Sequence, residues 1–179
     1  MEAFDAAKLS GLLSVAEDST RSAQVRGRAY EDVIDYLFTH VPGCQVQRNS
    51  LNTFQSEEVD LSVGNFRLEN GLRMLPDIFL IECKNWSQKV DSSAVAFFGM
   101  KIRHRGCSLG VLVAANGVTG DPIDKTAAMQ QGALLLAEGI KMLVLTSEDL
   151  HNFRTVEDIV GTLHRRFLDL HAAGTFTLA

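Results

Sequence analysis

Two acidic residues and a lysine lie at positions where neighbouring strands could bring their side chains together. Glu82 and Lys84 flank a single residue at the end of the apolar run IFLIEC, which indicates a central strand, so both side chains share one face. Asp60 lies on the polar face of the preceding run, where polar and apolar residues alternate. Asn70-Gly71 is a strong hairpin signal, and a hairpin about it pairs position 60 with about position 81. We therefore expect Asp60 beside Glu82, within one register step.

These side chains suit a hard divalent cation. Mg²⁺, or Mn²⁺ in its place, takes oxygen ligands, and Mg²⁺ binds them at about 2.0–2.1 Å while keeping several waters. Asp60 and Glu82 can supply two oxygens, and the backbone carbonyl of Cys83 can supply a third. Lys84 would then lie next to a water held by the ion, which it could orient or deprotonate, or it could offset charge on a scissile phosphate.

The helix that precedes these strands carries a fourth candidate, Glu31. In RGRAYEDVIDYLF, residues 26–38, apolar residues recur at helical spacing and define a buried face. Glu31 lies at the border of that face, about 20° from Phe38 on a helical wheel, so it can point toward the sheet. It could assist as an outer or second-metal ligand. The alternative is an ordinary ion pair with Arg28 or another cation.

A basic helix end and one aromatic residue are candidates for contact with nucleic acid. Lys101, Arg103 and Arg105 lie near the end of a helix expected over about residues 92–104. They either contact DNA phosphates or only complement the negative end of the helix dipole. Trp86 follows the strand of Glu82 and either stacks on a base or packs internally.

The remaining pattern predicts a mixed sheet with helices on both faces. Three consecutive strands precede further strands that alternate with helices. The strands are expected at about residues 44–51, 57–64, 77–85, 109–115 and 141–146. The helices are expected at about residues 2–17, 20–39 and 92–104, from an N-cap at Asp121 to Gly139, and from an N-cap at Thr155 to about residue 171. We expect one domain over residues 1–179, with a helical extension at 1–19, a core at 25–146 and a C-terminal helix at 155–172.

The composition is globular. Of the 179 residues, 46% are hydrophobic and 22% charged, and the net charge is −5. This charge argues against a surface that binds nucleic acid all round, but not against a basic rim around an acidic centre. No apolar run reaches the ~20 residues that cross a bilayer, and the N-terminus lacks a signal-peptide pattern. The three cysteines form no CxxC pair, so we expect a reduced, cytoplasmic protein without a membrane partner.

Together these motifs resemble the PD-(D/E)xK nuclease superfamily and, within it, the Mrr-like restriction endonucleases. The resemblance covers about residues 25–146 and implies an α/β, restriction-endonuclease-like αβββαβ core. It also implies Mg²⁺- or Mn²⁺-dependent hydrolysis of DNA phosphodiester bonds in restriction, defence or DNA repair. The matching elements are Gly27…Tyr30-Glu31, Val59-Asp60-Leu61, Glu82-Cys83-Lys84, Asn85-Trp86-Ser87…Val90 and the strand GVLVAANG at Gly110–Gly117.

The chain departs from that family pattern before Asp60, where Ser56-Glu57-Glu58 replaces the usual glycines. Pro76-Asp77 imitates part of the motif, but it precedes Glu82 on the same strand and is too close to be a ligand from a neighbouring strand. Two other classes of function stay open: a DNA-binding or assembly module without catalysis, and a nuclease for junction DNA or RNA. No DNA-reading domain is visible in the sequence, so specificity is expected from loops, a homodimer or a partner protein.

Overall fold

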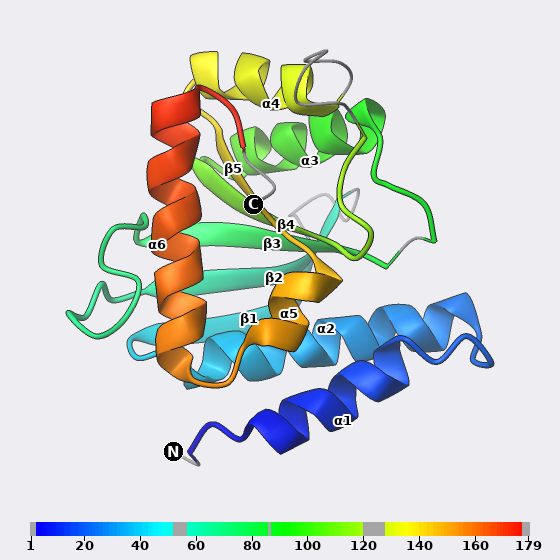
Figure 1. The fold of residues 1–179 in the computed structure, drawn as a ribbon. Helices are drawn as coiled ribbons and strands as arrows, with labels where there is room; N and C mark the ends of the chain where they lie inside the picture. Colours follow the sequence, from blue (N-terminus) through cyan, green and yellow to red (C-terminus); the bar gives the residue numbers. More distant parts are fainter. Residues whose placement is uncertain (1–2, 52–56, 86, 120–127, 177–179) are drawn as a thin grey trace.

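A mixed sheet of five strands forms the centre of the protein (Figure 1). The computed structural model describes residues 3–51, 57–85, 87–119 and 128–176. The strands lie side by side in chain order: β1 (Cys44–Leu51), β2 (Glu58–Asn65), β3 (Ile78–Lys84), β4 (Leu109–Ala114) and β5 (Lys141–Leu145). β1, β2 and β3 are antiparallel neighbours, whereas β3, β4 and β5 run parallel. This arrangement confirms the expected mixed sheet.

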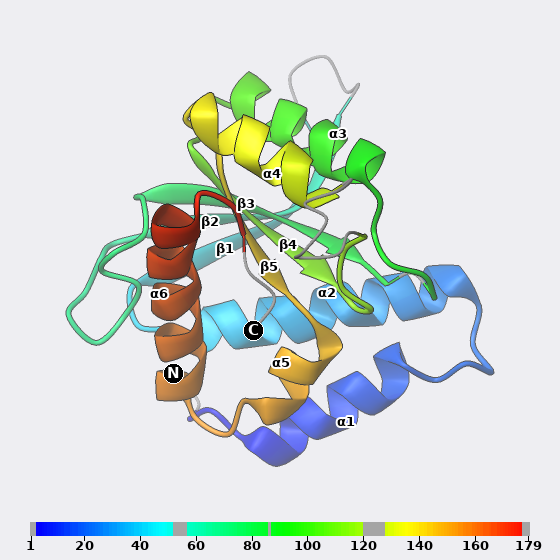
Figure 2. The ribbon, with the colours of Figure 1, turned by 45° about the horizontal axis from the view of Figure 1, so that its top comes forward.

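Helices cover both faces of the sheet (Figures 1 and 2). The described helices are α1 (Ala6–Ala16), α2 (Ala23–His40), α3 (Ser92–His104), α4 (Ala128–Ala137), α5 (Ser147–Asn152) and α6 (Val156–Ala173). α2 packs on the antiparallel strands and α1 packs on α2, whereas α3 and α4 pack against each other and on the parallel strands. α6 lies against β5. None of the described helices is long and apolar enough to cross a lipid bilayer.

The burial pattern of β2 determines which of its residues reach the core. Val59, Leu61 and Val63 are fully buried, whereas Asp60 and Ser62 between them are only half-buried. This two-residue period is that of a strand with one face packed on a helix. Asp60 therefore lies on the polar face of β2, as predicted.

The pairing of β2 with β3 lies within the one register step that the prediction allowed, and it confirms that Asp60 lies beside Glu82. Leu61 pairs with Ile81 in the antiparallel ladder, so Asp60 lies opposite Glu82 rather than opposite position 81. The two strands are joined by a folded loop over residues 66–77 and not by a tight two-residue hairpin. Gly71 lies near the middle of this loop, where a Cβ atom would come 2.1 Å from the carbonyl oxygen of Pro42. The loop is therefore centred where the sequence indicated, but packing on the core replaces the tight turn.

The bounds of the other elements mostly agree with expectation. The capping box at Thr155 and Asp158 begins α6 as predicted. The N-cap expected at Asp121 lies outside the described residues, and α4 is described only from Ala128 to Ala137. α5, which begins with a capping box at Thr146 and Asp149, is not among the expected helices.

Helix α3 approaches the sheet closely at Gly110 of β4. A Cβ atom at Gly110 would lie 2.4 Å from Cδ1 of Ile102 and 2.8 Å from a ring carbon of Phe98. Lys101 lies three residues after Phe98 and directly before Ile102, so the same close contact brings Lys101 toward the sheet.

We expect Gly110→Ala to destabilise the protein by about 1–3 kcal/mol, because the added methyl group forces α3 away from β4. Gly161→Ala on α6 is the matched control, since a Cβ atom there meets no atom within 4 Å. In a helix interior this control should gain about 0.5–1 kcal/mol. Urea unfolding of both variants measures the difference. If the two variants were equally stable, α3 would have moved to accommodate the methyl group at position 110 without a cost in the free energy of unfolding.

Candidate active site

The predicted acidic residues and lysine meet where β2 and β3 separate. The ladder between the two strands ends at the pair of Leu61 and Ile81. Beyond it, the backbone amide of Cys83 donates a hydrogen bond of 2.6 Å to Oδ2 of Asp60. The acceptor of this hydrogen bond is the Asp60 side chain of β2 rather than a backbone carbonyl of that strand. The carboxylate of Asp60 is therefore held against β3, across from Glu82.

Glu82 is a buried carboxylate shared by two lysines. Its residue is only 3% exposed. Lys84 Nζ donates to Oε1 of Glu82 at 2.8 Å, and Lys101 Nζ donates to both carboxylate oxygens at 2.9 Å. Lys101 comes from α3 and is itself only 6% exposed. A buried charge of this kind is tolerated because hydrogen-bonded counter-charges surround it.

The electrostatics of the site raise the pKa of Asp60. The pKa of its carboxyl group is raised from 3.8 to about 6, chiefly by burial and next by the neighbouring charge of Glu82. The hydrogen bond from the Cys83 amide and the charge of Lys84 act in the opposite direction, while the charge of Glu31 adds to the rise. The charge of Glu82 thus disfavours the ionised form of Asp60, and a cation next to Asp60 would offset this repulsion.

The donor set fits a divalent ion that keeps part of its water. Among the described residues, no three Asp, Glu, His or Cys side chains gather into a metal-binding cluster. Mg²⁺ is commonly held by one or two carboxylates, with waters and substrate phosphates completing its shell. Asp60 and Glu82 would supply those carboxylates. The predicted role of the Cys83 carbonyl stays a prediction.

Glu31 lies on α2 and is paired with an arginine. Its Oε2 is 3.3 Å from Nη2 of Arg48, and Nη1 of the same arginine is 2.6 Å from Oδ1 of Asp32. These residues line a surface hollow of ≈ 570 Å³ between α2 and β1. The ion-pair alternative therefore has a partner, and this partner is Arg48 rather than Arg28. The metal role of Glu31 stays a prediction, supported by the effect of its charge on the pKa of Asp60.

Lys101 is not part of a basic surface at the end of α3, which corrects its assignment as a DNA contact. Its side chain enters the carboxylate site, which is formed by Asp60 and Glu82. It does so because Lys101 shares the buried face of α3 with Phe98 and Ile102. The three-residue spacing between Phe98 and Lys101 is the sequence signal that Lys101 is buried. The cations that follow Lys101 instead favour the interpretation of an exposed basic helix end.

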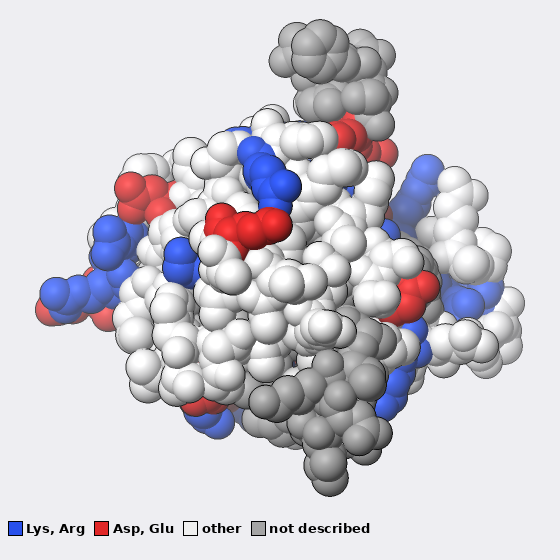
Figure 3. All heavy atoms as spheres, turned by 90° about the horizontal axis from the view of Figure 1, so that it is seen from above, with Lys and Arg blue, Asp and Glu red and all other residues white. Residues whose placement is uncertain are grey.

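The other predicted DNA contacts have partners within the protein or lie outside the described residues. Arg103 forms an ion pair with Glu138. Arg105 Nη2 donates to the backbone carbonyls of Ser50 and Glu57 at 2.8 and 2.9 Å. Figure 3 looks down on α3 and α4 and shows positive and negative side chains interspersed on a mostly uncharged face. Trp86 lies outside the described residues.

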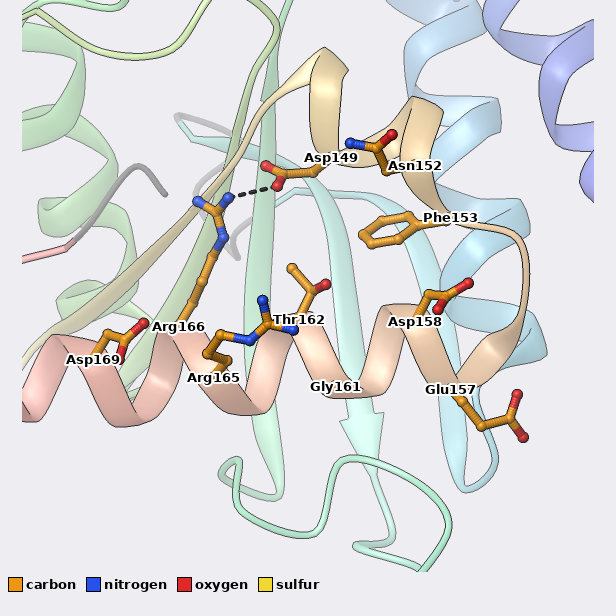
Figure 4. A pocket seen from close by; sticks show the side chains of 10 residues that line it. All are labelled: Asp149, Asn152, Phe153, Glu157, Asp158, Gly161, Thr162, Arg165, Arg166 and Asp169. Atoms are coloured by element: carbon orange, nitrogen blue, oxygen red, sulfur yellow. Dashed lines mark hydrogen bonds and ion pairs between the residues drawn. The ribbon is translucent and has the colours of Figure 1, made fainter.

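Two further features are separate from the carboxylate site. Asp77 precedes β3, its side chain is 79% exposed and it lies 3.7 Å from Arg67, as expected for a residue outside the site. A hollow of ≈ 320 Å³ between α5 and α6 contains none of the predicted site residues (Figure 4). There the buried Arg166 donates to Asp149 and to the Val144 carbonyl, which ties α6 to α5 and β5.

Fold and site together define a restriction-endonuclease-like protein, with an acidic residue on β2 and a Glu-x-Lys motif on β3. A family model of the Mrr catalytic domain (Mrr_cat), described as restriction endonuclease, matches residues 22–145. The chain therefore belongs to this family, and the recognition made from its motifs is confirmed. A search of curated proteins found no match. The matched range begins at the N-cap of α2 and ends with β5, so α1, α5 and α6 lie outside it.

We expect Asp60→Asn to stabilise the protein in the presence of a chelator at about pH 7. The raised pKa means that folding favours the neutral carboxyl group. This stability is present below about pH 4 and is lost as the pH rises through about 6. Asparagine keeps an oxygen for the Cys83 amide but carries no charge, so the variant should be about 1–3 kcal/mol more stable at pH 7.

Thermal or urea unfolding at a series of pH values measures this difference. The gap between variant and wild type should close as the pH falls to about 3, below the unfolded-state pKa of 3.8, where Asp60 is neutral in both the folded and the unfolded state. If the wild type were instead more stable than Asp60→Asn at pH 7, the interactions of the ionised carboxylate with Cys83 and Lys84 would outweigh the cost of its burial.

Proposed function

We propose that this protein is a divalent-metal-dependent endonuclease that hydrolyses DNA phosphodiester bonds. Membership of the restriction endonuclease family supports nuclease action on DNA. The metal dependence is supported chiefly by one observation. Asp60 on β2 lies next to Glu82 on β3, and Lys84 donates a hydrogen bond to Glu82. A carboxylate pair with an adjacent ammonium group suits Mg²⁺ or Mn²⁺ and a phosphate substrate.

In this proposal each residue has a separate task. Asp60 and Glu82 would hold the ion, which would supply Lewis-acid polarisation of the phosphate and a lower pKa for water. The Cys83 amide orients Asp60. The side chain of Lys84 is 23% exposed, so its ammonium group can reach the solvent side of the site, orient the attacking water and offset charge on the phosphate. Glu31 assists as an outer ligand.

Three coarser features of the proposal concern the whole chain. We infer one nuclease-like domain over residues 1–179, supported by the packing of α1 and α6 on matched elements. The three free thiols support a reducing cytoplasmic setting. Cutting both strands of a duplex needs two sites, so we propose that a second copy or a partner protein supplies the other site and the specificity.

The decisive experiment is a panel of substrates incubated with Mg²⁺, Mn²⁺ or a chelator. Duplex DNA, a four-way DNA junction and RNA are compared side by side at equal protein concentration. Cleavage of duplex DNA that requires the ion supports the proposal. Cleavage of only the junction or only RNA would reassign the substrate, and binding without any cleavage would indicate a module that has lost catalysis.

Lys84→Ala should lower the rate of cleavage by at least about 100-fold, because the attacking water and the phosphate lose their cation. The variant should still fold, since Glu82 keeps both hydrogen bonds from Lys101. Lys141→Ala at the start of β5 removes the same charge away from the site and serves as the control. Single-turnover cleavage, with circular dichroism to verify folding, measures the effect. Cleavage by Lys84→Ala at the rate of the control would refute the assignment.

Asp60→Asn should abolish divalent-ion binding, whereas Asp77→Asn should retain it. The first variant removes an anionic ligand, and the second removes an exposed carboxylate before β3. Both changes lower the negative charge equally, so each variant controls for the other. Calorimetric titration with Mn²⁺ compares the two. The reverse outcome would reassign the acidic ligand to Asp77.

A further inference from the structure

Lys101 lies against both oxygens of Glu82, the carboxylate that is proposed to hold the ion. Its Nζ atom is 2.9 Å from each carboxylate oxygen, so the ammonium group lies midway between them. Lys84 already takes Oε1 from another direction, at 2.8 Å. Because Glu82 is only 3% exposed, few other directions lead to its oxygens. A divalent ion and the Lys101 ammonium group therefore compete for one place.

We propose that Lys101 is a resident cation of the site, and that a divalent ion binds Glu82 by displacing the Lys101 ammonium group. This inference rests on the proposed function, because it takes Glu82 as a ligand of the ion. In the unloaded protein, the ammonium group keeps a buried carboxylate from lacking a counter-charge. In the loaded protein, the ion and the Lys101 ammonium group would lie against the same two oxygens. Their repulsion at low dielectric constant would displace the ammonium group, which carries the smaller charge.

A second contact gives the displaced ammonium group a place to go. The Nζ atom of Lys101 already lies 5.1 Å from the ring centroid of Phe97, within the range of a cation–π interaction. Phe97 precedes Phe98 on α3 and is 49% exposed, so its ring borders solvent. The four-carbon stem of lysine has enough rotatable bonds to move the ammonium group from Glu82 toward this ring. Lys101 is thus a positioning residue for Glu82 and a competitor of the ion.

The test is calorimetric titration of Mn²⁺ into the full chain without DNA. Lys101→Met keeps the length and apolar stem of the side chain and removes the competing charge. We expect its affinity for Mn²⁺ to rise at least about tenfold over wild type. Arg103→Met is the matched control, because it removes one charge from the same helix, where Arg103 is exposed and paired with Glu138. Its affinity should stay within about twofold of wild type.

Lys101→Gln provides a second neutral variant that still donates a hydrogen bond to Glu82 and so protects the fold. It should also bind Mn²⁺ more tightly than wild type. If Lys101 merely supported the structure, its loss would weaken Mn²⁺ binding or leave it unchanged, and either result in a folded variant overturns the proposal.

The wild-type protein offers a readout that needs no variant. Lys101 should resist an amine-acylating reagent in the presence of a chelator and should become reactive when saturating Mg²⁺ is added, as located by mass spectrometry. The exposed Lys89 should react equally in both conditions. If Lys101 stays protected with Mg²⁺ bound, no exchange takes place.

Failure of the exchange and failure of the proposed function give different results. If wild type binds Mn²⁺ and cleaves DNA but Lys101 neither competes nor moves, the exchange alone is overturned. If wild type and both Lys101 variants bind no divalent ion and cleave no substrate, the nuclease proposal is overturned, and the exchange with it.

Discussion

The structure of the site depends on the burial of one carboxylate, that of Glu82. An ionised carboxylate out of contact with water is tolerated only when hydrogen-bonded cations surround it. Two elements meet this requirement: β3 through Lys84, and α3 through Lys101. The second is available only because α3 approaches the sheet at Gly110, where a side chain would collide with Phe98 and Ile102. The position of a whole helix is therefore coupled to the charge of a single residue.

Most of the sheet and the central pair of acidic residues could be predicted from the sequence, because their signals are local. The alternation in β2 and the apolar run of β3 define the faces of Asp60 and Glu82, and the loop centred near Gly71 limits the register to one step. The pairing of Lys101 with Glu82 spans 19 positions and two elements, so only the packing of α3 on the sheet reveals it. The partner of Glu31 likewise depended on how α2 lies over β1.

Helix α1, which lies outside the matched family range, contacts the site region. The side chain of Asn85, which directly follows Lys84, donates to the carbonyl of Ala16 at the end of α1 at 2.9 Å. The start of the same helix is tied to α2 through a hydrogen bond of 2.8 Å from the Asp5 amide to the Tyr36 hydroxyl. The residue after the Glu-x-Lys motif is thus anchored by α1, and α1 is anchored in turn by the helix that carries Glu31.

The hydrogen bond from residue 83 to Asp60 comes from the main chain, so it does not depend on which side chain occupies position 83. Nineteen amino acids carry that amide hydrogen, and only proline lacks it. The side chain of Cys83 packs against the core, whereas its backbone nitrogen orients the acidic group on the neighbouring strand. The Glu-x-Lys motif specifies no residue at position 83. The backbone at that position nevertheless makes one of the contacts that build the site.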